Sequence, residues 1–353
     1  MIDYRQYAGK KVLLTGHTGF KGAWMVAALH SLGAEIVGYA LAPESETCLF
    51  NDLNIESLCT SVIGDIRDKS ELDKVITDYA PDIVFHFAAQ ALVLKSYAIP
   101  SETFDVNVIG TANVLESIGK LNSKCSVVVV TTDKVYENYE WNYPYRENDR
   151  LGGYDPYSAS KACAEIVVSS FRNSFFNVNA ITEHKKSIAS VRAGNVIGGG
   201  DYSENRIIPD VILALQNNKS VLLRNPNSVR PWQHVLEPIF SYLKIGLLLS
   251  KNPEKYSLAL NIGPSTDDIL TVEELVQKAI KVWGSGSYTT QDAVQRHEAK
   301  LLQLDISLAS NLIDWIPVYN SAEAVEKTIQ WYMAENKLEF TYKQIKDYLG
   351  EIS

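Results

Sequence analysis

Tyr157 and Lys161 lie four positions apart, and their side chains could act together in a redox reaction. A helix places residues four apart on one face, so both side chains would meet the same ligand. A tyrosine is a poor base near its ordinary pKa of about 10, but a neighbouring ammonium group favours the phenolate. Tyr157 could then take a proton from a hydroxyl group whose carbon is being oxidised. The alternative is that Tyr157 and Lys161 lie on a surface helix by chance.

Three further polar residues, Thr132, Asp133 and Lys134, follow the apolar run 127–130. Ligands of open α/β sheets bind beyond the carboxyl ends of the strands, where these residues would lie. A carboxylic acid and a neutral amine at one strand end could protonate a leaving group and remove a proton. The plain alternative is a strand-end ion pair between Asp133 and Lys134.

A glycine-rich turn lies between the apolar run 11–14 and the apolar stretch 23–29. Glycines let the backbone turn sharply and approach a pyrophosphate, whose charge lies at the positive end of the following helix. A strand before the turn and a helix after it therefore predict a dinucleotide site. We expect the cofactor to contact Gly16, Thr18, Gly19, Phe20 and Gly22.

The elements that must position these residues alternate along the first half of the chain. Apolar runs at 35–40, 59–63, 82–87 and 126–130 predict strands, and longer helices are expected at 104–118 and 159–175. Near-continuous apolar strands separated by helices indicate an α/β fold with a doubly wound parallel (Rossmann) sheet.

After Arg192, glycines and prolines interrupt shorter elements, which predicts a smaller, mixed α/β C-terminal domain over the sheet. We expect an NAD-binding domain at 1–188, with a segment near 233–263 returning to it. The interleaved substrate-binding domain would span 189–353. The polar stretch 182–187 predicts a surface loop.

The composition and charge of the chain limit the classes of protein to which it could belong. The chain has 353 residues, 46% hydrophobic and 21% charged, as expected for an enzyme of about two domains. It lacks a long apolar stretch and the layout of a signal peptide, so we expect a cytoplasmic protein without a membrane partner. The net charge of −9 argues against nucleic acid as a partner. The four cysteines lack metal-ligand spacing, so we expect reduced thiols and no metal site.

These motifs resemble those of the extended short-chain dehydrogenase/reductase family, and within it the nucleotide-sugar 4,6-dehydratases. The resemblance extends over most of the chain through the segments 131–134, 146–149, 151–158, 190–201 and 230–238. Lys134 stands where many related dehydratases have glutamate, and it resembles the members that act on CDP-glucose. Beyond about Ser265 the match is loose and rests on 297–299 and 304–305.

The resemblance implies dehydration of CDP-glucose or a similar nucleotide-sugar with NAD as cofactor. Hydride leaves C4, water is lost across C5 and C6, and the hydride returns to C6. Thr132 would hydrogen-bond the reacting oxygen, Asp133 would protonate the 6-hydroxyl, and Lys134 would remove the C5 proton, with Glu137 as the fallback base. The product would serve deoxysugar synthesis for surface polysaccharide, including lipopolysaccharide.

The resemblance also implies further binding residues. Lys161 would hold the nicotinamide ribose, and the remaining cofactor contacts would come from Asp65, Ile66, Phe87, Ala88, Ala89, Gln90, Thr131 and Tyr157. Substrate would contact Asn195, Arg206 and Arg230. Between residues 38 and 52 there is no arginine or lysine to meet a 2′-phosphate, which favours NAD over NADP.

Four other polar residues have structural explanations. Arg192 is either a phosphate ligand or part of a buried ion pair. His86 and His234 lie in apolar surroundings and are expected in the core, while Asn107 would satisfy a buried backbone group.

Two other functions are compatible with parts of the sequence. A 4,6-dehydratase or 4-epimerase for another nucleotide-sugar would share Tyr157 and Lys161, whereas a non-catalytic NAD-sensing scaffold usually loses this pair.

The helices at 104–118 and 159–175 carry more apolar positions than one sheet face can cover: Val106, Ile109, Val114, Ile166, Val167 and Phe171. We therefore expect a homo-oligomer, a dimer or tetramer, in which these helices pair across a two-fold axis, as in the family.

Overall fold

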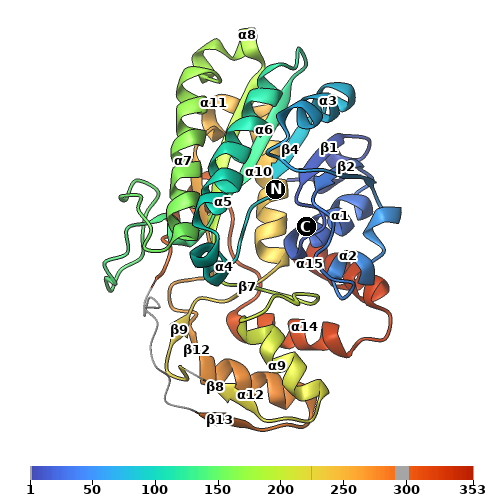
Figure 1. The fold of residues 1–353 in the computed structure, drawn as a ribbon, viewed down its shortest axis with the longest axis vertical. Helices are drawn as coiled ribbons and strands as arrows, with labels where there is room; N and C mark the ends of the chain where they lie inside the picture. The colour runs from blue at the N-terminus through green and yellow to red at the C-terminus, as the bar shows by residue number, and fades with distance from the viewer. Residues whose placement is uncertain (1, 224, 291–301, 353) are drawn as a thin grey trace.

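A seven-stranded parallel sheet forms the centre of the molecule (Figure 1), in the strand order β11-β6-β5-β4-β1-β2-β3. The computed structural model describes residues 2–223, 225–290 and 302–352, so the expected match at 297–299 lies outside it. The predicted doubly wound α/β fold is confirmed. The sheet contains β1 (Lys11–Thr15), β2 (Glu35–Ala40), β3 (Thr60–Ile63), β4 (Ile83–His86), β5 (Cys125–Val130), β6 (Lys186–Ala193) and β11 (Ala259–Ile262).

Helices cover both faces of this sheet because successive strand residues point to opposite sides. Leu13 packs into the cluster formed with the helices at 69–79, 110–119 and 156–174, whereas Val12 and Leu14 pack into the cluster on the other face. The helices that cover the sheet are α1 (Phe20–Ser31), α3 (Lys69–Tyr79), α6 (Gly110–Gly119), α7 (Pro156–Ser174), α10 (Leu236–Lys251) and α15 (Lys337–Ile352).

The helix that carries the predicted redox pair begins earlier than its apolar pattern indicated. Asp155 is the N-cap of α7 and accepts a hydrogen bond from the Ser158 amide, while Pro156 occupies the first helical position. Both features favour a helix start at this point. Tyr157 therefore lies in the first turn of α7.

The second predicted long helix is divided into three connected parts. It consists of α5 (Pro100–Phe104), a π-helical turn at 105–109 and α6. The expected helix at 104–118 is thus confirmed, with a local widening of its hydrogen-bond pattern.

Short elements from the second half of the chain lie below the sheet in Figure 1, where α9, α12, β8 and β13 are grouped. They are β7 (Val196–Ile197), β8 (Val221–Leu223), β9 (Val229–Arg230), β10 (Gln233–His234), β12 (Leu270–Thr271), β13 (Tyr288–Thr290), α9 (Ile207–Gln216), α12 (Val272–Trp283), α13 (Ser307–Ile313) and α14 (Ser321–Met333). The remaining short helices are α2 (Leu49–Asp52), α4 (Val93–Ala98), α8 (Ile181–His184) and α11 (Pro253–Tyr256). Within the segment 233–263 that was expected to return to the first domain, β11 joins the main sheet by pairing with β6.

Two sequence-based expectations about the segment before β6 are wrong. The boundary expected after residue 188 falls inside β6, and the stretch 182–187 is not a surface loop but the end of α8 and the start of β6. Lys186 is fully buried, and its ammonium group donates to the carbonyl oxygens of Leu121, Ser123 and His184. A buried charge is tolerated when hydrogen bonds satisfy it. The polar residues of 182–187 were therefore not sufficient evidence for a surface loop.

The described residues contain neither a helix long and apolar enough to cross a membrane nor a metal-binding group of three or more His, Cys, Asp or Glu side chains. All four cysteines are free thiols.

A buried carboxyl group joins α10 to the end of the chain. The Glu237 side chain accepts hydrogen bonds from the Val318 and Tyr319 amides at 3.0 and 2.7 Å. The Tyr348 hydroxyl of α15 donates to its other oxygen at 2.8 Å. Burial raises the pKa of Glu237 to about 7 and outweighs these hydrogen bonds, which favour the carboxylate.

Glu237 should therefore make the stability of the fold depend on pH. Its pKa in the folded protein lies above the ordinary 4.5, so the folded state binds the proton more tightly than the unfolded chain. This contribution to stability is complete below about pH 4.5 and is lost as the pH rises to about 7, by at most about 1.4 kcal/mol per pH unit. Urea unfolding between pH 4.5 and 8 should show this slope for the wild type but not for Glu237→Gln; parallel profiles would contradict it.

Candidate active site

The glycine turn between β1 and α1 has the close contacts that only glycines permit. Gly16 has a φ of +82°, and a Cβ atom there would lie 2.7 Å from the Ala88 nitrogen. A Cβ atom on Gly22 would lie 2.0 Å from the Gly16 carbonyl oxygen. Gly19 is the N-cap of α1 and supplies no side-chain cap, so the first amides of the helix can face an anion. This cradle fits the pyrophosphate of a dinucleotide.

The loops expected to line the rest of the cofactor site are fixed by local hydrogen bonds. The Thr15 hydroxyl accepts from the amides of Phe87 and Ala88 at 3.2 Å. Asn107 accepts from the Gln90 amide at 2.8 Å and donates to the Gln90 carbonyl at 3.0 Å. The expected structural role of Asn107 is therefore confirmed.

Other expected cofactor residues lie beside the same turn. The Thr18 hydroxyl donates to the Leu41 carbonyl at 2.9 Å. Asp65 pairs with Arg67 at 2.6 Å, and this contact lowers the pKa of Asp65. Ile66 is buried and fills the space beside Gly110, where an added Cβ atom would lie 2.4 Å from its Cδ1.

The three polar residues at the end of β5 have different surroundings. The Thr132 hydroxyl donates to the Asp133 carboxylate at 2.9 Å, and both side chains are buried. Lys134 is half-buried, and among the described residues it has no carboxylate within the 4.0 Å of an ion pair. The strand-end ion pair between Asp133 and Lys134, the plain alternative, is therefore not formed. The Thr131 hydroxyl donates to Glu165 at 2.6 Å and so faces α7.

Tyr157 and Lys161 meet the end of β5 from α7. The Lys161 ammonium donates to the Val130 carbonyl at 2.9 Å. Burial lowers the pKa of Lys161 to about 8, and the charge of Lys21 acts in the same direction. Burial raises the pKa of Tyr157 to about 12, although hydrogen bonding with Thr132 lowers it. The protein groups alone therefore do not make Tyr157 a base at neutral pH, and its expected role also depends on a bound cofactor.

Lys21 is a member of this site that the sequence analysis did not single out. It follows Phe20 in the glycine turn, and burial lowers its pKa to about 8. Arg206 lowers this pKa further, whereas Asp133 and Asp201 raise it. Lys21 therefore faces the same polar cluster as Asp133. The position of this lysine inside the predicted dinucleotide-binding turn is the sequence feature that could have identified it as a site residue.

The three expected substrate residues come from the segments after β6. Asn195 has a φ of +45°, and its carbonyl accepts from the Gln233 amide at 3.1 Å. Arg206 is half-exposed and pairs with the buried Asp201 at 2.9 Å. The Arg230 guanidinium donates to the Val229 carbonyl at 2.9 Å in β9. Arg206 influences the pKa of Tyr157, so the structure brings it towards the redox pair.

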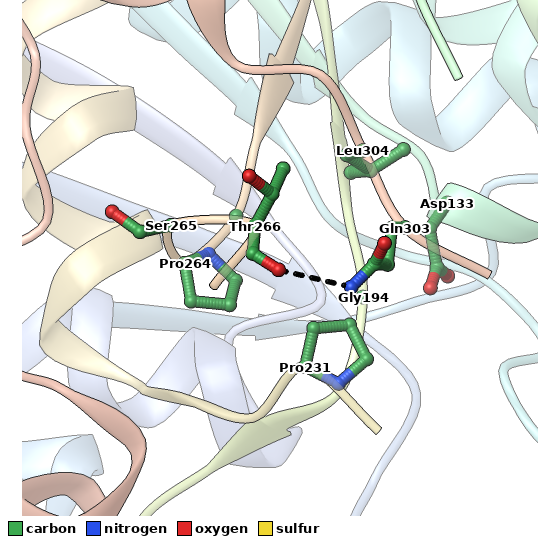
Figure 2. A pocket seen from close by; sticks show the side chains of 9 residues that line it. Asp133, Gly194, Pro231, Pro264, Ser265, Thr266, Gln303 and Leu304 are labelled. Atoms are coloured by element: carbon green, nitrogen blue, oxygen red, sulfur yellow. Dashed lines mark hydrogen bonds between the residues drawn. The ribbon is translucent and has the colours of Figure 1, made fainter. Parts of the chain in front are cut away.

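A small cavity opens beside Asp133 (Figure 2). The Gln303 amide closes one side of it by donating to the Thr266 carbonyl at 3.1 Å. The cavity is lined by Asp133, Gly194, Pro231, Gly263, Pro264, Ser265, Thr266, Gln303 and Leu304. It therefore lies between the strand ends of the sheet and the segments of the second half of the chain.

Three polar residues that lie in or near the sheet are structural. Arg192 forms a buried ion pair with Glu165 at 2.9 Å. Of its two possible roles, phosphate ligand or member of an ion pair, the structure therefore supports the ion pair. His86 lies in the core and hydrogen-bonds Thr15 and Thr111, and His234 is fully buried, as expected.

The sequence and the fold were compared with known proteins. The family model described as GDP-mannose 4,6 dehydratase matches residues 13–328. A CDP-glucose 4,6-dehydratase of Salmonella typhimurium is 44% identical over 355 residues, covering 99% of each chain. A CDP-paratose 2-epimerase of Salmonella typhi is 27% identical over 341 residues, covering 91% of this chain and 98% of that protein.

Among solved structures, the DesIV double mutant, a dTDP-glucose 4,6-dehydratase of Streptomyces venezuelae with NAD and DAU bound, has a TM-score of 0.78. It is 22% identical and covers 92% of this chain and 97% of that chain, which supports the fold. Together with the match of the family model over most of the sequence, these similarities lead to one conclusion. The chain belongs to the GDP-mannose 4,6 dehydratase family.

Proposed function

We propose that this protein is a hydro-lyase that converts CDP-D-glucose to CDP-4-keto-6-deoxy-D-glucose with NAD as cofactor. The observation that carries the proposal is the position of Thr132, Asp133 and Lys134 at the end of β5, opposite Tyr157 of α7. The 44% identity to a CDP-glucose 4,6-dehydratase over 99% of both chains supports the choice of substrate.

NAD fits the glycine turn, where Gly16, Gly19 and Gly22 leave room for a pyrophosphate at the start of α1. The chemistry that bound NAD supplies is reversible hydride exchange with the hexose. The adenosine half would contact Asp65 and Ile66, and the loop 87–90 with Thr131 would line the remainder.

Tyr157 takes the proton of the 4-hydroxyl, and the Thr132 hydroxyl orients that oxygen. Lys161 holds the nicotinamide ribose, and its ammonium group favours the phenolate of Tyr157. Burial raises the pKa of Tyr157 to about 12, so the positive charge of an oxidised nicotinamide is needed to make it a base at neutral pH. Deprotonation of Tyr157 is thereby coupled to cofactor binding.

Asp133 and Lys134 remove water from C5 and C6. The C5 proton becomes acidic when C4 is a ketone, and Lys134 removes it, while Asp133 protonates the departing 6-hydroxyl. Asp133 is 3% exposed and accepts a hydrogen bond from the Thr132 hydroxyl at 2.9 Å, which holds its carboxyl group at the end of β5. A 4-epimerase needs no such acid and base. The absence of an ion pair between Asp133 and Lys134 among the described residues favours dehydration over this alternative.

The nucleotide and sugar would be bound by the second half of the chain, as a substrate domain interleaved with the sheet. Asn195, Arg206 and Arg230 are its polar contacts, because guanidinium groups match pyrophosphate oxygens. Asp201 holds Arg206 beside the site. The enzyme would act in the cytoplasm and supply deoxysugars for surface polysaccharide.

Incubation with CDP-, dTDP-, GDP- and UDP-hexoses, followed by mass analysis of the products, tests the proposal. Loss of one water from CDP-glucose alone supports it. Loss of water from a different nucleotide-sugar favours a 4,6-dehydratase with that substrate. An isomer of unchanged mass favours a 4-epimerase.

Tyr157→Phe should reduce turnover by at least about 100-fold, since general acid–base groups contribute at least this much. The phenyl ring still packs, so NAD should bind with an affinity close to that of the wild type. Product formation and calorimetric NAD binding measure the two effects separately. Near-normal turnover would refute the assignment of Tyr157 as the base in C4 oxidation.

Lys134→Met should block dehydration but permit oxidation at C4. Absorbance of reduced nicotinamide should then accumulate on addition of substrate, with no 4-keto-6-deoxy sugar released, and solvent deuterium should not enter C5. If this variant dehydrates at a normal rate, Lys134 is not the base, and Glu137, which lies 2.8 Å from Arg150, becomes the next candidate.

Asp133→Asn should stop the reaction at a different stage. The C5 proton can still leave, so solvent deuterium should enter C5 while loss of the 6-hydroxyl is slowed by about 100-fold or more. A variant that fails in both steps would argue that Asp133 holds the site together rather than donating a proton.

The proposal includes a homo-oligomer, at least a dimer, formed through α6 and α7. Ile109 and Ile166 are 52% and 58% exposed, and Val106, Val167 and Phe171 are only partly buried. Val114 is fully buried and belongs to the sheet face. The exposed apolar positions therefore remain for a second copy, to be paired in a four-helix contact.

Light scattering at micromolar concentration should give the mass of at least a dimer. Ile166→Glu places a charge in the apolar contact and should shift the protein to monomer. Leu213→Glu is the matched control, because Leu213 is 63% exposed on α9 and lies outside the proposed contact. A wild-type monomer would show that α6 and α7 only cover the sheet.

A further inference from the structure

Gly194 follows β6 on the wall of the cavity beside Asp133 (Figure 2). The φ angle of Gly194 does not lie in the left-handed region that favours glycine. Seven other described glycines have a positive φ, and Gly200 is the nearest of them along the chain. Any residue could therefore adopt the backbone conformation of Gly194. The reason for a glycine at this position must be space.

The space is occupied by one neighbouring group. A Cβ atom on Gly194 would lie 2.0 Å from Oδ2, 2.1 Å from Cγ and 2.5 Å from Oδ1 of Asp133. These are the three nearest atoms, and all belong to the same carboxyl group. Contacts this short cannot exist, so a side chain at position 194 and the observed orientation of Asp133 exclude each other.

The backbone around Gly194 is held in place. Its carbonyl oxygen accepts from the Gln233 side-chain amide at 3.0 Å, and the Gln233 backbone amide donates to the Asn195 carbonyl at 3.1 Å. Within the described part of the chain, the Asp133 carboxylate is held by one hydrogen bond, from the Thr132 hydroxyl at 2.9 Å. When a side chain is introduced, the Asp133 side chain is therefore the group that must move.

We propose that Gly194 is a positioning residue that sets the orientation of the Asp133 carboxyl group. The missing side chain provides the space in which this acid points into the cavity, next to the Thr132 hydroxyl. This inference rests on the proposed function, because it gives the orientation of Asp133 a task in protonating the departing hydroxyl group. It assigns no direct contact between Gly194 and the reacting atoms.

Gly263 provides a matched control in the same cavity wall. A Cβ atom there would meet Ile306 and Leu304 at 3.8 Å, which is ordinary van der Waals contact. Gly194→Ala and Gly263→Ala thus add the same methyl group to one cavity, and only the first meets the acid.

Gly194→Ala should fold with a melting temperature close to that of the wild type and should reproduce the defect of Asp133→Asn. Product formation should fall by about 100-fold or more. Oxidation at C4 and entry of solvent deuterium at C5 should stay within about threefold of wild-type rates. Gly263→Ala adds a methyl group to the same cavity without meeting Asp133, so its product formation should fall far less than that of Gly194→Ala, with no selective loss of the step in which the 6-hydroxyl departs.

Two further measurements make the inference decisive. The double variant Gly194→Ala, Asp133→Asn should lose no more than Asp133→Asn alone, because both changes disable the same group. A crystal structure of Gly194→Ala should show the carboxyl group of residue 133 rotated away from the cavity. Additive losses, an unmoved carboxyl group or a rate within threefold of the wild type would each overturn the proposal.

The failure of the proposed function would look different. If the wild type dehydrates none of the nucleotide-hexoses, the function is wrong, and the crystal structure of Gly194→Ala still tests whether Gly194 sets the orientation of Asp133. If the wild type dehydrates CDP-glucose and Gly194→Ala does so equally well, only the role of Gly194 is wrong.

Discussion

The buried ion pair between Glu165 and Arg192 fixes the helix that carries the redox pair against the sheet. Glu165 lies one helical turn after Lys161 in α7, and Arg192 lies near the end of β6. The same carboxylate accepts hydrogen bonds from the hydroxyl groups of Thr131 and Ser190 at 2.6 and 2.9 Å. Removing one partner from such a pair typically costs about 3–5 kcal/mol, because a charge is left buried without compensation. The position of α7 relative to β5 therefore depends on this contact.

The ion pair continues into a polar network that reaches the cavity. Arg192 donates to the Tyr136 hydroxyl at 2.8 Å, and Tyr136 donates in turn to Asn261 of β11 at 2.6 Å. Asn261 donates to the Asp305 carbonyl at 3.1 Å, next to the cavity residue Leu304. The ends of β5 and β6, the middle of α7 at Glu165 and the wall of the cavity are thus joined by one set of hydrogen bonds. Satisfied networks of this kind make the surrounding side chains rigid.

Local patterns in the sequence predicted the strands and the glycine turn, because short apolar runs and tight turns depend on neighbouring residues. Contacts between distant segments were beyond such patterns. The burial of Lys186 depends on three carbonyl groups, two of them more than sixty residues away. The clearance that Gly194 gives to Asp133 depends equally on a partner that sequence order does not reveal. The rise in the pKa of Tyr157 could not be predicted from neighbouring residues either, since burial is a property of the folded chain.

Both ends of the chain belong to the sheet domain, and this has a consequence for biosynthesis. The Tyr7 hydroxyl near the amino end donates to the Leu243 carbonyl of α10, and Tyr342 of α15 hydrogen-bonds His30 of α1. In a chain emerging from the ribosome, α1 therefore covers only part of one face of the first five strands until α10 has been translated. The nucleotide-binding half cannot finish folding as an autonomous nascent domain.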